Sequence, residues 1–217
     1  MNDKTNSTAP ATRRVLPKGV RKEQLIKATM KCIARYGMSG TTMALVTKEA
    51  GLSLGIANLH FESKEKLLLE TLLHVTGEYN RGQTKILDND SDLSVAARME
   101  AILQFDFSSK VATKDKVAVW FAFWGEAKSR PTYQKICSNT DFMAEDALCA
   151  LFNQAIDESN YVDSNAAIIA SGYTALVDGL WLNMLIAPKH LSRKQALQVA
   201  RDYLAAAFPH HIKRTTG

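Results

Sequence analysis

Hydrophobic positions recur at helical spacing from Val20 onward. A first segment with apolar side chains three and four residues apart stops at Gly37. Thr42 can cap a short second helix that ends at Gly51, and Ser53 can cap a third helix directly afterwards. The pattern therefore predicts three helices, the last two joined by a turn that contains glycine.

The same spacing continues through the rest of the chain. Ser63 can cap a long fourth helix, and later apolar periodicities end near residue 207. The further predicted helices span residues 93–108, 114–128, 132–158, 163–187 and 192–207. No run of alternating β-branched residues requires a strand, so the predicted fold class is all-α.

Composition places the chain among ordinary globular proteins. It has 217 residues, of which 46% are hydrophobic and 23% are charged, and this length fits one or two domains. No stretch of 18 uncharged apolar residues occurs and the N-terminal segment is polar, so we expect neither a membrane span nor a secretory signal. Three cysteines without a C-x-x-C motif are typical of the reducing cytoplasm.

Charge is distributed unevenly along the chain. Residues 1–60 hold 10 Lys and Arg against 3 Asp and Glu, a net charge of +7, whereas residues 61–217 carry a net charge of −2. This asymmetry favours a head that binds a polyanion, although a merely solvated basic surface would look the same. We therefore expect a flexible basic tail (1–19), a head that binds a polyanion such as DNA (20–66) and a helical body with another task (67–217).

The turn at Gly51 gives the second and third helices the form of a helix-turn-helix, whose last helix enters the DNA major groove. The side chains expected to contact DNA are Thr42, Ser53, Leu54, Gly55, Ile56, Asn58, His60 and Lys64. Among them Asn58 can bond adenine, and Leu54 or Ile56 can touch a thymine methyl group. Many helical proteins contain such a helix pair for structural reasons alone, which is the competing interpretation.

Two aromatic segments stand out in the body, residues 120–127 and 173–182. Trp120 and Trp124 lie one turn apart on a common helix face. Asp178 is an acid within an apolar helix and requires a cation or hydrogen-bond donors if it is buried. Aromatic faces beside a carboxylate suit a quaternary ammonium ligand. The alternative is that the aromatic rings fill the core and that Asp178 bonds a neighbouring side chain.

The last two predicted helices are strongly apolar. Their expected faces are Ala166, Ile169, Ala170, Tyr173, Val177 and Leu180 on one helix and Leu197, Ala200, Leu204 and Phe208 on the other. Two copies of this pair would form a symmetric four-helix interface, whereas a monomer would have to bury both faces internally. A dimer would present two recognition helices about 34 Å apart to a palindrome.

The run from Thr42 to Leu67 resembles the signature of the TetR family of regulators, with AGLSLG at residues 50–55 followed by Phe61 and Lys64. This resemblance implies a homodimeric repressor that binds a double-stranded palindromic operator and a small-molecule effector. It assigns DNA binding to the head (20–66), and ligand binding and dimerisation to the body (67–217). The sequences WFAFWGEA and DGLWL resemble its BetI-type subgroup, which responds to choline and controls glycine betaine synthesis. The resemblance implies ligand contacts from Trp120, Trp124, Glu126, Tyr173, Asp178 and Trp181.

No cofactor or metal is expected, because the histidines show no ligand spacing and no nucleophile elbow, phosphate loop or zinc-protease motif occurs. The chain is therefore expected not to be an enzyme. Two alternatives remain at this point. The first is a regulator of the same fold that answers to an apolar or anionic metabolite, and the second is a helical ligand-binding protein that does not bind DNA. The sequence leaves open the operator, the regulated genes, the identity and effect of the effector, and any redox role of the cysteines.

Overall fold

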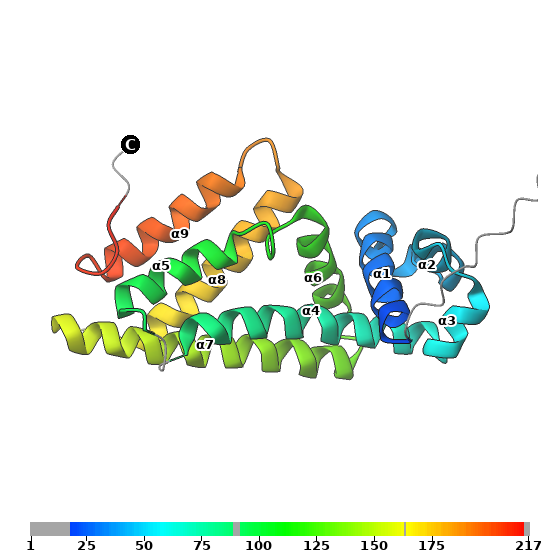
Figure 1. The fold of residues 1–217 in the computed structure, drawn as a ribbon. Coiled ribbons are helices and arrows are strands. Elements are labelled where there is room, and N and C mark those ends of the chain that lie inside the picture. The colour runs from blue at the N-terminus through cyan, green and yellow to red at the C-terminus, as the bar shows by residue number, and fades with distance from the viewer. Residues whose placement is uncertain (1–17, 89–91, 163, 215–217) are drawn as a thin grey trace, which may run out of the picture.

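The computed structural model describes residues 18–88, 92–162 and 164–214 (Figure 1). Within these ranges the chain forms nine α-helices and no strand, as the sequence predicts. The helices are α1 (Lys18–Gly40), α2 (Met43–Ala50), α3 (Leu54–His60), α4 (Lys64–Leu87), α5 (Val95–Asp106), α6 (Lys114–Ala127), α7 (Pro131–Ser159), α8 (Ala166–Ile186) and α9 (Arg193–Ala207). The predicted helices past residue 90 agree with α5 to α9 to within three residues at each end.

The head consists of α1, α2 and α3 together with the start of α4. Its small core includes Val46, Ala57 and Phe61, each at most 1% exposed. Thr47 and Ala50 are also buried, and their small side chains let α1 and α2 pack closely. The three helices that the sequence predicts thus pack around a small core of their own.

Two glycines shape the head because both adopt positive φ angles. Gly37 has a φ of 70° and interrupts α1 at the predicted stop, after which the helix continues for less than one turn to Gly40. Gly51 has a φ of 64° and a ψ of 33° and ends α2, and its N–H donates to the Lys48 carbonyl at 3.2 Å. This left-handed residue turns the chain from α2 into α3.

The long helix α4 runs from the head along the body and packs against α5 and α7 (Figure 1), while α6, α8 and α9 complete the body through contacts with α5, α7 and one another. One face of α1 also belongs to the body, since Met30 and Ile33 are buried in the body's core. Helix α1 packs against α6 as well as against α4. The head is therefore joined to the body through three helices rather than through a linker.

The apolar faces of α8 and α9 do not have the role that their pattern suggested. The residues of these faces that are buried within the single chain are Ala166, Ala170, Tyr173, Val177, Leu180, Ala200, Leu204 and Phe208. The prediction that these faces form the interface between two copies was therefore wrong. They pack against the other body helices, because α8 lies across α6 and α7 while α9 lies against α5 and α8.

Helix α8 is apolar on its outer side as well. By length and composition alone it could cross a membrane, and only 28% of its most apolar 18-residue window is buried in the chain. Its exposed side includes Ile168, Leu182 and Ile186. A helix with apolar residues on both sides fits a second packing partner beyond its own chain.

Replacing Gly51 with Ala is expected to lower the free energy of unfolding by about 1–2 kcal/mol, because a Cβ is unfavourable at this left-handed position. A Cβ here would meet no atom within 4 Å, so a steric clash cannot cause the loss. Urea unfolding followed by circular dichroism measures the effect. Gly51→Asn is the control and should lose less, since Asn tolerates this conformation. Equal stability of Gly51→Ala and the wild type would contradict the prediction.

Candidate DNA-binding head and ligand-binding body

Helix α3 presents most of its side chains outward. Ala57 faces the core of the head, and Leu54 on the outer side is 50% exposed. The other side chains expected to contact bases are exposed or partly exposed, namely Gly55, Ile56, Asn58 and His60. Helix α3 thus has the free outer face that insertion into a major groove requires.

Leu59 is a residue of this face that the sequence reasoning missed. It is 68% exposed, and it follows Asn58 on the outer side of α3. The signal was present in the spacing, because Ala57 and Phe61 are both buried and residue 59 lies between them. An exposed leucine beside an amide suits a thymine methyl group next to adenine.

Thr42, Ser53 and Lys64, three of the residues expected to contact DNA, lie at helix starts. Thr42 Oγ1 accepts the Leu45 N–H at 3.2 Å, and Ser53 Oγ accepts the Ile56 N–H at 3.3 Å. Both side chains are exposed, so their hydroxyl groups remain accessible to a phosphate. Lys64 is placed differently, since its Nζ donates to the Met38 carbonyl at 3.2 Å and holds the start of α4 to the end of α1.

Ion pairs take up part of the basic charge of the head. Lys22, Lys27 and Lys31 pair with Glu70, Glu23 and Glu49 at N–O distances of 3.0, 2.6 and 3.0 Å. Lys48 and Lys66 are exposed and form no such pair within the described ranges. Arg13 and Arg14 of the predicted basic tail lie outside the described residues. The charge that is free to meet phosphates is therefore smaller than the sequence count indicates.

A buried carboxylate lies at the centre of the body. Asp106 is 1% exposed, and its Oδ1 and Oδ2 accept the hydroxyl groups of Tyr79 at 3.0 Å and Tyr173 at 2.8 Å. Its carbonyl oxygen accepts the Trp181 Nε1–H at 3.0 Å. Burial raises the pKa of Asp106 to about 7, and the two hydroxyl groups oppose that rise.

Aromatic rings surround this carboxylate. Tyr79 meets Trp120 and Trp181 edge to face at centroid distances of 6.0 and 6.1 Å, and Trp120 lies 5.9 Å from Trp124. The structure thus brings together Trp120, Tyr173 and Trp181 of the predicted ligand site. Sequence reasoning missed Asp106, the group on which they converge, although an acid between two phenylalanines in Phe105-Asp106-Phe107 was a visible signal.

Two other predicted ligand residues, Trp124 and Asp178, lie in a separate cleft of about 240 Å³ between α6, α7 and α8. We call it the acid cleft, and its lining comprises Trp124, Ala127, Gln134, Cys137, Ser138, Asp141 and Asp178. Burial, followed by the neighbouring Asp141, raises the pKa of Asp178 to about 7. Burial and the nearby Glu145 raise the pKa of Asp141 to about 6.

Two carboxylates and one indole N–H of the acid cleft lack a basic or hydrogen-bonding partner among the described residues. Neither Asp141 nor Asp178 forms an ion pair with a lysine or arginine of the described residues. The buried Trp124 Nε1 has no hydrogen-bond partner in the same part of the chain. Glu126 lies elsewhere, because its Oε2 pairs with Arg130 Nε at 3.2 Å and the residue lines neither the acid cleft nor the cavity described next.

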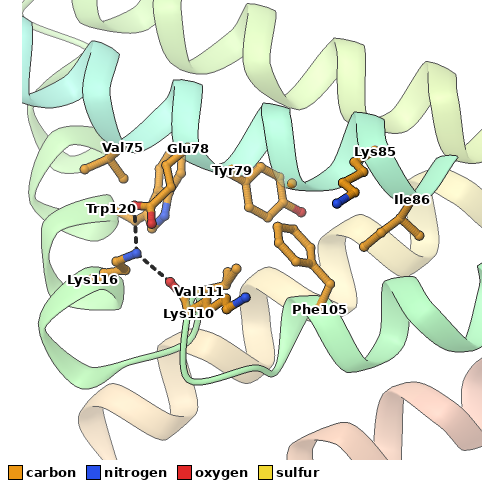
Figure 2. A pocket seen from close by; sticks show the side chains of 11 residues that line it. Val75, Glu78, Tyr79, Lys85, Ile86, Phe105, Lys110, Val111, Lys116 and Trp120 are labelled. Atoms are coloured by element: carbon orange, nitrogen blue, oxygen red, sulfur yellow. Dashed lines mark hydrogen bonds and ion pairs between the residues drawn. The ribbon is translucent and has the colours of Figure 1, made fainter. Parts of the chain in front are cut away.

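A second cavity of about 290 Å³ opens between α4, α5 and α6 (Figure 2). We call it the α4–α5–α6 cavity, and its lining comprises Val75, Glu78, Tyr79, Gly82, Lys85, Ile86, Phe105, Lys110, Val111, Lys116 and Trp120. Of the predicted ligand residues only Trp120 lines it. The described ranges hold no group of three or more His, Cys, Asp or Glu side chains that could hold a metal ion.

Two family models match the chain, one over the head and one over the body. Residues 25–71 match the family described as bacterial regulatory proteins, tetR family. Residues 95–209 match the family described as BetI-type transcriptional repressor, C-terminal. The regulator BetI of Burkholderia mallei is 32% identical over 185 residues, which cover 85% of this chain and 92% of that protein.

Solved structures share the fold. A transcriptional regulator from Pseudomonas aeruginosa PAO1 is 27% identical with a TM-score of 0.75, covering 90% of this chain and 94% of that one. A regulator from Saccharomonospora viridis, solved in complex with choline, is 20% identical with a TM-score of 0.75 and covers 89% and 98% of the two chains. The chain therefore belongs to the TetR family of DNA-binding regulators, a non-enzymatic family, and carries a BetI-type C-terminal domain.

Proposed function

We propose that the protein is a cytoplasmic, homodimeric repressor that binds a palindromic operator and responds to choline or a related quaternary ammonium compound. The regulated genes are those of choline and glycine betaine metabolism. The main support for this ligand class is the acid cleft, where Asp141 and Asp178 lie beside Trp124 without a basic partner among the described residues. The BetI relatives and the choline complex of the Saccharomonospora regulator support the same ligand class.

A quaternary ammonium ion matches the acid cleft in two interactions, attraction to carboxylates and contact with an aromatic face. It cannot donate hydrogen bonds, so it is held by charge and by an aromatic face, which Asp178, Asp141 and Trp124 supply together. The ion would also offset the repulsion between the two carboxylates that raises the pKa of Asp178. A bound cation would therefore lower the electrostatic free energy of the two neighbouring carboxylates.

DNA binding falls to the outer face of α3. Asn58 bonds an adenine edge while Leu54 and Leu59 contact thymine methyl groups, and Thr42 and Ser53 fix the register on phosphates. Bound in this way, a repressor covers the promoter and excludes the polymerase. Because lysines and arginines displace counterions from DNA, the affinity falls steeply with salt.

The exposed side of α8 supplies the dimer interface. Six of its eight exposed residues form a stripe along the helix, namely Ile168, Ser171, Ala175, Gly179, Leu182 and Ile186. The small residues at the middle of the stripe let two helices approach closely, and the large apolar residues at its ends are then removed from water. The interface is symmetric, since the same stripe serves on both copies.

The ligand signal passes through α6. Trp124 of the acid cleft lies on α6, which packs directly against α1 of the head. A ligand that favours one position of α6 therefore favours one orientation of the head. Repression is relieved if the ligand-bound orientation gives a head spacing that mismatches the operator, which requires different ligand affinities for the two states.

Asn58→Ala is expected to weaken operator binding about tenfold or more, because a bidentate contact to adenine contributes about 1–3 kcal/mol of discrimination. Fluorescence anisotropy with labelled DNA from the gene's own promoter, at one fixed salt concentration, measures the change. Asn139→Ala, an exposed change on α7, is the control and should bind as the wild type does. Unchanged binding by Asn58→Ala would speak against α3 as the reading helix.

Choline affinity is expected to rise from pH 6 to pH 8. Asp178, with a pKa of about 7, is mostly protonated at pH 6 and mostly ionised at pH 8, and only the ionised carboxylate attracts the cation. One such group accounts for a gain of roughly tenfold. Titration of tryptophan fluorescence with choline at each pH measures it.

Asp178→Asn should weaken choline binding and flatten this pH dependence. Asp146→Asn, an exposed change on the same bundle, should do neither. A choline affinity that is independent of pH in the wild type would place the cation outside the acid cleft.

Ala175→Arg is expected to convert the dimer into a monomer, because two guanidinium groups would face each other at the centre of the α8 stripe. Size-exclusion chromatography with light scattering should give twice 24.0 kDa for the wild type and 24.0 kDa for the variant. Ala150→Arg on the exposed side of α7 should remain dimeric. A dimeric Ala175→Arg would exclude α8 as the central contact.

A further inference from the structure

The α4–α5–α6 cavity combines an apolar interior with a basic rim. Its walls are built from Val75, Tyr79, Ile86, Phe105, Val111 and Trp120. Four charged side chains complete the lining, the lysines 85, 110 and 116 and a single acid, Glu78. The lining therefore carries a formal net charge of +2, opposite in sign to that of the acid cleft.

The one acid at this rim is already engaged. Lys116 Nζ lies 2.7 Å from Glu78 Oε2, and the same ammonium group donates to the Lys110 carbonyl oxygen (Figure 2). This contact joins α4, α6 and the loop between α5 and α6 at one end of the cavity. It leaves no free carboxylate in the lining for a cationic ligand.

The other two lysines keep their charge unpaired. Neither Lys85 nor Lys110 forms an ion pair or a side-chain hydrogen bond within the described ranges. Lys85 extends from α4 and Lys110 from the loop before α6, and their ammonium groups lie on either side of the Phe105 ring in Figure 2. Two unpaired ammonium groups at the rim of an apolar cavity can bind an anionic group through charge-assisted hydrogen bonds.

We infer that the α4–α5–α6 cavity is a second effector site, which binds a small monocarboxylate with an apolar body. The carboxylate lies between Lys85 and Lys110, and the apolar body packs on Tyr79, Phe105 and Trp120. A simple cation is disfavoured here by the excess of ammonium groups, as an anion is disfavoured in the acid cleft. The two cavities therefore select ligands of opposite charge.

The position of the cavity connects it to the head. Tyr79 belongs to α4 and Trp120 to α6, and α1 of the head packs against both helices. Trp120 also lies 5.9 Å from Trp124, a wall of the acid cleft. A ligand wedged between α4 and α6 thus acts on the elements that carry the cation signal, and the regulator integrates two metabolites.

The test measures binding of 3-phenylpropionate and its uncharged amide, 3-phenylpropionamide, to the full chain by isothermal titration calorimetry. The acid should bind at least about tenfold more tightly than the amide, because charge-assisted hydrogen bonds to lysine are lost with the charge. The double variant Lys85→Met/Lys110→Met should lose that preference and still bind choline as the wild type does. The control Lys128→Met/Lys135→Met, two exposed lysines elsewhere, should keep it.

Gly82→Ala tests the shape of the cavity without changing its charge. A Cβ at residue 82 would collide with the Phe105 ring and push it from its place in the wall. The acid and the amide should both bind more weakly to this variant, with the acid still preferred.

Equal binding of the acid and the amide by the wild type, or an unchanged preference in the Lys85/Lys110 variant, would overturn the inference. The proposed response to choline is tested by separate titrations, because choline binding depends on Asp178 and carboxylate binding on Lys85 and Lys110. Loss of one response without the other therefore shows which of the two proposals fails.

Discussion

The burial of Asp106 is the constraint on which the body of this protein depends. Its carboxylate joins the end of α5 to Tyr79 of α4 and Tyr173 of α8, while its carbonyl oxygen holds Trp181 of the same α8. A buried carboxylate is costly unless donors surround it, so the three helices must meet in one register. Of the three aromatic donors, only Tyr79 also lines a cavity, the α4–α5–α6 cavity, whereas Tyr173 and Trp181 are buried in the core.

The body has a negative interior as a result. Asp106 and Asp141 each raise the pKa of Asp178, and Asp106 and Asp178 both disfavour ionisation of Tyr79. The contribution of these two carboxylates to stability is therefore fully present below about pH 4, and it is lost as the pH rises through about 7. A bound cation would reverse part of that loss. In the proposed choline complex, the repulsion between these carboxylates would contribute to the free energy of cation binding.

The head and the body share helices, which gives ligand binding a direct mechanical route to DNA binding. Helix α1 contributes Leu25 to the core of the head and Met30 and Ile33 to that of the body. Lys64 bonds the Met38 carbonyl and fixes the start of α4 to the end of α1. With α6 packed on the body side of α1, a small shift of α6 cannot be absorbed by a flexible linker. Residues of α6 line both cavities, and the two linings have opposite charge.

The sequence by itself determined what is local. Polar caps, glycines and helical periodicity specified the helix boundaries, the turn at Gly51 and the outward face of α3, and the spacing of four residues specified the contact between Trp120 and Trp124. Each of these depends on residues within one or two turns of each other, where backbone geometry alone fixes the relation. The family signature lies in the same local stretch.

Only the tertiary structure decided which residues far apart in the chain meet. Asp106 contacts Tyr173 across 67 positions, a relation that no periodicity contains. Asp178 and Trp181 were expected to share a site. Asp178 instead lines the acid cleft beside α6 and α7, whereas Trp181 bonds Asp106 at the end of α5. The two residues are three positions apart on α8 but have different helices as neighbours. Helix α8 is apolar on all sides, so its pattern could not show which face is buried within the chain and which remains for a second copy.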